Sequence, residues 1–169
     1  MLHERIIRPL QLRHTFAAGR STSITPTPVP ATLFHQGSPL HLPLLFSSFR
    51  GIYSTSGDPI AFMRAFIRGV LFQNPATLSA MQQPWRRFGL PLDSAALRAP
   101  GWPIEYGLGL MRFQLPRIVT PWQAVPAVIG HTGSTGCWLF YCPDLDVYLS
   151  GSVNEVTAGA VPFGSSPSS

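Results

Sequence analysis

The chain has 169 residues, of which 45% are hydrophobic and 11% charged, and its mean hydropathy is slightly positive at +0.17. This composition suits one globular domain, or a large piece of one, and excludes wholesale disorder. Twelve arginines and no lysine stand against seven acids, which gives a net charge of +5.

The excess of positive charge lies in the first 100 residues, where ten arginines against three acids give +7. The remaining residues hold two arginines and four acids, a charge of −2. Because only Arg86 and Arg87 are adjacent and no basic run occurs, we expect no nucleic-acid surface.

In chain order, residues 2–8 are expected to form a short helix that ends before Pro9. Residues 19–49 are rich in Pro, Ser and Thr and predict a long surface loop. Apolar residues at helical spacing predict a helix over 59–71, and Asn74 precedes a second short helix as its expected cap. Residues 84–104 are again predicted to be irregular.

The last third is different, because residues 105–154 contain apolar and aromatic runs separated by turn residues. They predict an antiparallel meander of three strands with a fourth beside it, followed by a frayed tail at 160–169. Helices followed by a meander indicate a fold of the α/β class, of α+β type, with helices packed on an antiparallel sheet. We expect a single domain, 1–169.

Neither a signal peptide nor a transmembrane segment is predicted, so the compartment stays open. If "CWLFYC" is one strand, Cys137 and Cys142 lie on opposite faces about 16 Å apart, too far for a disulfide. His35 and His41 have no acidic or Cys partner at ligand spacing, so no metal is expected, and no cofactor is expected either.

The run "GHTGSTG" before an apolar stretch is the candidate site. A Walker-type phosphate loop would need a lysine after the glycines, and a dinucleotide fingerprint would need a helix after them. Neither condition is met, since "CWLFY" is β-like. Two interpretations remain from the residues alone: a tight hairpin turn with His131 as a structural hydrogen-bonding group, or an active-site strand.

Four segments, taken in order, resemble the carboxy-terminal part of the serine β-lactamase and penicillin-binding-protein superfamily. The closer likeness is to class C β-lactamases, D-alanyl-D-alanine carboxypeptidases and related esterases. The segments are "ERIIRPLQLRHTF" (similar to I-x-x-PLGM-x-x-T), "RGIYSTSGDPIAFMRAF" (GGLxSTxxDLARF), "EYGLGL" (YGLGW) and "GHTGSTGCWLFYCPDLDVYLSGSVN" (GH(S/T)GxxG and the hairpin that follows it).

The resemblance implies a partial β-lactamase/transpeptidase-like fold in which His131, Thr132 and Ser134 serve catalysis. His131 would orient or polarise substrate and assist proton transfer, Thr132 would bind a substrate carboxylate or carbonyl, and the Ser134 N–H would be an oxyanion donor. Gly133 and Thr135 would line the substrate site. A His where the family usually has Lys points to its peptidase and esterase members.

The family's Ser-x-x-Lys nucleophile cannot occur in a chain without lysine, and its Tyr-x-Asn element is also missing. In the family both lie upstream of the matching segment. We therefore expect a carboxy-terminal fragment of a serine hydrolase that is inactive alone. The alternatives are a pseudoenzyme or binding module that keeps the cleft wall and a basic protein that contacts an acidic partner.

The ligand implied is a small acyl peptide, an ester or a β-lactam. A half-domain would also leave apolar surface uncovered, which favours self-association.

Overall fold

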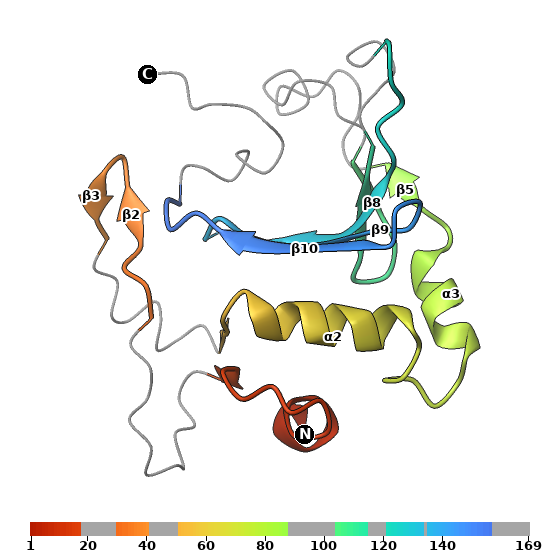
Figure 1. The fold of residues 1–169 in the computed structure, drawn as a ribbon, viewed down its shortest axis with the longest axis horizontal. Coiled ribbons are helices and arrows are strands. Elements are labelled where there is room, and N and C mark those ends of the chain that lie inside the picture. Colours follow the sequence, from red (N-terminus) through yellow and green to blue (C-terminus); the bar gives the residue numbers. More distant parts are fainter. Residues whose placement is uncertain (18–29, 41–50, 88–103, 115–120, 134, 157–169) are drawn as a thin grey trace.

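The architecture is a six-stranded antiparallel sheet with a helix packed along one face (Figure 1). This confirms the α+β class with helices on an antiparallel sheet. The computed structural model describes residues 1–17, 30–40, 51–87, 104–114, 121–133 and 135–156. The expected tail at 160–169 lies outside these residues.

The chain begins with η1, a π-helix over His3–Ile7, close to the helix predicted at 2–8. Its inner side buries Ile7, and Leu12 in the turn that follows is also buried. A short antiparallel pair then joins β1 (Phe16–Ala17) to β4 (Ile52–Tyr53), in which the rings of Phe16 and Tyr53 stack with centroids 5.3 Å apart.

Two helices follow, α2 over Gly57–Ile67 and α3 over Ala76–Gln82. Helix α2 ends before Gly69, whose φ of +73° is a conformation that glycine adopts without strain. Asn74 caps α3 as predicted, since its Oδ1 accepts a hydrogen bond from Ala76 N–H at 2.9 Å.

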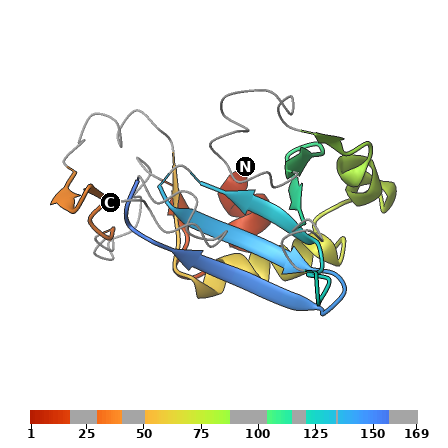
Figure 2. The same cartoon turned by 90° about the horizontal axis from the view of Figure 1, so that it is seen from above.

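The main sheet has the order β10-β9-β8-β7-β6-β5, with every neighbouring pair antiparallel (Figure 2). It thus has two more strands than the four predicted, and β5 lies in a stretch predicted to be irregular. The strands are β5 (Arg86–Arg87), β6 (Ile104–Tyr106), β7 (Met111–Phe113), β8 (Val128–Thr132), β9 (Cys137–Cys142) and β10 (Val147–Ser152).

The predicted loop at 19–49 contains a small hairpin, β2 (Phe34–His35) with β3 (Ser38–Pro39). The predicted long loop thus includes four residues in strands. The hairpin is stabilised from a distance, because Phe34 N–H donates to Asn154 O at 2.6 Å and Val156 N–H donates to Phe34 O at 2.9 Å. The amino-acid composition of residues 30–40 does not indicate which distant residues will form hydrogen bonds with them.

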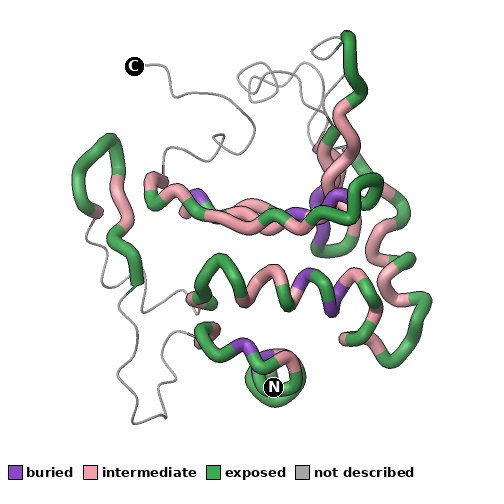
Figure 3. The backbone as a smooth tube through the Cα atoms, in the orientation of Figure 1, coloured by how far each residue is buried: buried purple, intermediate pink, exposed green. Residues whose placement is uncertain are grey.

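The core lies between α2 and the sheet, where buried residues appear on both layers (Figure 3). Met63 and Phe66 of α2 pack with Ile129 of β8. Tyr148 of β10 also contacts this cluster, so the alternating residues Val147 and Leu149 face the other way, and they are 41% and 45% exposed.

Both cysteines are free thiols, as predicted, with Cys137 exposed and Cys142 buried. Within the described residues, no helix is long and apolar enough to cross a membrane.

Candidate active site

The candidate site lies where β8 ends and turns into β9. Strand β8 is a central strand, with Gly130 opposite Met111 of β7 on one side and Phe140 of β9 on the other. Beyond Thr132 the turn is closed by two backbone hydrogen bonds, from Gly133 N–H to Cys137 O at 2.7 Å and from Gly136 N–H to Gly133 O at 3.1 Å. The "GHTGSTG" run is thus both a sheet strand and a hairpin turn.

The glycines of this run let backbones and side chains approach closely. A Cβ on Gly130 would collide with the backbone oxygen of Leu139, and one on Gly136 would collide with that of Val153. A Cβ on Gly133 would lie 2.5 Å from the Cys137 Sγ. Gly136 also has a φ of +75°, which favours glycine.

His131 is exposed at the end of β8. Its Nδ1 lies 2.6 Å from the carbonyl oxygen of Thr132, and since a carbonyl only accepts, Nδ1 carries the proton. In the neutral ring Nε2 is then the proton acceptor, and no hydrogen bond to it is present among the described residues. Tyr106 of β6 meets the imidazole edge to face, with ring centroids 6.1 Å apart.

Thr132 and Thr135 of the run are half-buried. Thr132 lies opposite Trp138 of β9, and the Thr135 Oγ1 is 3.6 Å from the Cys137 Sγ. Four of the five predicted site residues, His131, Thr132, Gly133 and Thr135, therefore belong to one short hairpin. The fifth, Ser134, lies outside the described residues, and so does its proposed oxyanion N–H.

The "EYGLGL" segment forms β6 and the turn into β7, one strand away from β8. Leu108 N–H donates to Met81 O at 2.8 Å, which attaches this turn to the end of α3. The remaining segments supply η1 and α2. The four segments that carry the resemblance thus contain the chain's first helix, its main core helix, strand β6 and the adjacent strands β8, β9 and β10.

Two further interactions were not predicted from the sequence. Arg112 of β7 forms an ion pair with Glu105 of β6 and lies over the ring of Trp85, 4.8 Å from its centroid. The Glu155 carboxylate accepts hydrogen bonds from Gln36 N–H at 3.1 Å and Gly37 N–H at 3.2 Å. The sequence alone does not predict these contacts. The first depends on the register of β6 against β7, and the second depends on the position of the β2–β3 hairpin.

No group of three or more His, Cys, Asp and Glu side chains that would suit a metal ion is found in the described part of the chain.

Comparison with protein families places the chain in one of them. The model of the Beta-lactamase family matches residues 1–161, nearly the whole chain, so the protein belongs to that family. This confirms the predicted superfamily. Searches of curated proteins and of solved structures gave no match.

Proposed function

We propose that these residues are the carboxy-terminal part of a β-lactamase-related serine hydrolase and that β8 forms one wall of its acyl-transfer cleft. The observation that supports this most directly is the exposed His131, followed by the half-buried Thr132 and Gly133, at the end of a central strand in a chain of the Beta-lactamase family.

The proposed chemistry assigns a role to each exposed group. With Nδ1 used by the Thr132 carbonyl, Nε2 of His131 is an acceptor when the ring is neutral and a donor when it is protonated, which suits proton transfer to or from a reacting acyl group. Thr132 binds a substrate carboxylate or carbonyl, with Gly133 and Thr135 beside it. The Ser134 N–H stabilises the negative charge that develops on the carbonyl oxygen, an effect of about 3 kcal/mol for one such donor.

Among the family's activities, we infer peptidase or esterase chemistry rather than efficient β-lactam hydrolysis. A histidine attracts a substrate carboxylate less strongly than a lysine at neutral pH. The ligand proposed is an acyl peptide, an ester or a β-lactam.

The 169 residues contain no lysine and hence no Ser-x-x-Lys pair, so we propose that they do not catalyse the reaction alone. A pseudoenzyme or binding module that uses the same wall is the second candidate, favoured by the same missing pair.

Binding and turnover by the chain separate these possibilities. The probes are an N-acyl-D-alanyl-D-alanine peptide, a p-nitrophenyl ester and a chromogenic cephalosporin. We expect no hydrolysis above buffer but shifts of the Gly133 and Gly136 amide resonances on addition of a probe. His131→Ala is expected to reduce these shifts, whereas His35→Ala, an exposed histidine outside the strand, leaves them unchanged. Hydrolysis by the chain alone would contradict the proposed inactivity, and equal shifts in both variants would contradict the site.

The nucleotide sequence upstream of the Met1 codon tests the missing pair directly. An in-frame segment that encodes Ser-x-x-Lys and Tyr-x-Asn supports the hydrolase. A stop codon with a ribosome-binding site at Met1 favours the binding module instead.

A further inference from the structure

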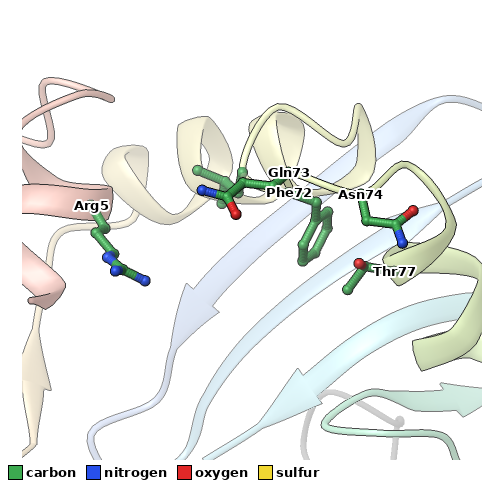
Figure 4. Close-up of a pocket in the computed structure, with 6 residues that line it drawn as sticks. Arg5, Phe72, Gln73, Asn74 and Thr77 are labelled. Atoms are coloured by element: carbon green, nitrogen blue, oxygen red, sulfur yellow. The ribbon is translucent and has the colours of Figure 1, made fainter.

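A cavity of about 550 Å³ lies between η1 and the connection from α2 to α3, away from the candidate active site. Figure 4 shows Arg5 extending from η1 and the other labelled residues coming from the connection and the start of α3. The volume falls within the range of small-molecule sites. The lining residues are Arg5, Leu71, Phe72, Gln73, Asn74 and Thr77.

The apolar side of this cavity is held in place by the core. Leu71 and Phe72 both pack against the core cluster, and the Phe72 ring meets Phe66 of α2 edge to face at 5.2 Å between centroids. The backbone below them is fixed, since Phe72 N–H donates to Gly69 O at 3.1 Å. An aromatic surface is therefore presented in a preformed position.

The polar side consists mainly of hydrogen-bond donors. The Asn74 Oδ1 is already used by Ala76 N–H, which leaves its amide NH₂ to donate, and Gln73 and Thr77 add an amide and a hydroxyl. In the part of the chain that the structure describes, no acidic residue lines the cavity.

Arg5 gives the cavity its charge. The ion pairs of η1 use Glu4, which contacts His3 at 3.3 Å and Arg8 at 3.6 Å. Among the described residues Arg5 forms no ion pair, so none of their carboxylates neutralises its guanidinium. Guanidinium groups bind carboxylates with charge-assisted, often bidentate hydrogen bonds.

We propose that this cavity is a binding site for a small organic carboxylate that carries an aromatic or aliphatic group. The carboxylate pairs with Arg5, the amide and hydroxyl donors bind the other polar atoms of the ligand, and the apolar group lies on Phe72 and Leu71. This site is separate from the acyl-transfer wall, because none of the described residues in 130–136 lines it.

Titration with a defined pair of probes tests the proposal. N-acetyl-phenylalanine carries the carboxylate and the ring, and its primary amide keeps the ring but has no charge. We expect saturable binding of the acid in the millimolar range, with the amide about tenfold weaker or worse, as loss of one charge-assisted contact predicts.

Matched variants locate the site. Arg5→Gln is expected to weaken binding of the acid about tenfold, and Thr77→Val to weaken it by a smaller factor. Arg8→Gln is the control, because it removes a charge from the same helix at a residue that does not line the cavity. Should Arg5→Gln fail to fold by circular dichroism, the comparison of acid with amide on the unaltered chain decides the question.

His131→Ala separates this site from the proposed active site. Unchanged affinity of His131→Ala for the acid supports a separate site, and weakened affinity would place the probe at β8 and overturn the proposal. Equal binding of acid and amide, equal loss in Arg5→Gln and Arg8→Gln, or no binding at millimolar concentration would also overturn it.

Discussion

Gly136 and Val153 are in direct backbone contact at the end of the sheet. The Val153 N–H donates to Gly136 O at 2.9 Å, and the Val153 carbonyl occupies the space that a side chain on residue 136 would need. The turn after the His131-Thr132-Gly133 strand is thereby fastened to the end of β10, which makes its shape dependent on a distant part of the chain.

Gly136→Ala is expected to destabilise the fold by about 2 kcal/mol or more, because it combines a positive φ with a collision against backbone. Gly133→Ala is the matched control, with an expected loss of about 1 kcal/mol, since the neighbouring Cys137 Sγ can rotate away. Urea unfolding of both variants measures the difference. Equal losses would show that the turn does not depend on the contact with Val153.

Asp58 at the start of α2 joins two distant segments, because its Oδ2 accepts hydrogen bonds from His14 N–H and Thr15 Oγ1, both at 2.8 Å. Asp58→Ala is expected to cost about 1–3 kcal/mol in unfolding free energy. Asp144→Ala, at an exposed turn, should stay within about 0.5 kcal/mol of the unaltered chain. Similar effects of the two substitutions would mean that the Asp58 contacts contribute nothing measurable.

Burial raises the pKa of Tyr141 above the ordinary value of 10.0, with a further contribution from the Asp146 charge. A raised pKa in the folded state means that the unfolded chain loses this proton first. The associated stability is therefore fully present below about pH 10 and is lost as the pH rises through the pKa of the folded state. Urea midpoints across this range should fall less steeply for Tyr141→Phe. Identical slopes would contradict a perturbed Tyr141.

Strand β10 is at the edge of the sheet, and Val147 and Leu149 expose apolar surface beside that edge. Edge strands of this kind favour pairing between copies, so we expect concentration-dependent self-association. Leu149→Lys should reduce it in sedimentation velocity, whereas Leu108→Lys, exposed in the β6–β7 turn, should not. A chain that stays monomeric at high concentration would refute this prediction.

The sequence predicted best where a segment's structure depends on its own residues. The apolar spacing of α2, the Asn74 cap and the strand-turn-strand pattern around His131 are local signals, and the structure follows them. Asp58 shows the limit, because its carboxylate makes tertiary contacts with residues 14 and 15 that no local pattern indicates.

The elements that were missed are those held by distant partners. The β2–β3 hairpin has four strand residues in a Pro-rich segment and depends on hydrogen bonds from residues 154–156. Strand β5 has two residues and exists because β6 pairs with it. Composition and periodicity do not predict such pairings between distant residues. The family resemblance could be recognised because each of its motifs is a continuous stretch of sequence.

The contact between Gln36 and Glu155 spans 119 positions of the chain. Bringing such distant residues together costs loop-closure entropy, which is recovered only after the intervening helices and strands have formed. We therefore expect the hairpin at 30–40 to dock late in folding, after β10 has formed. Protection of the Gln36 and Gly37 amides from hydrogen exchange should therefore appear only in chains whose sheet has already folded.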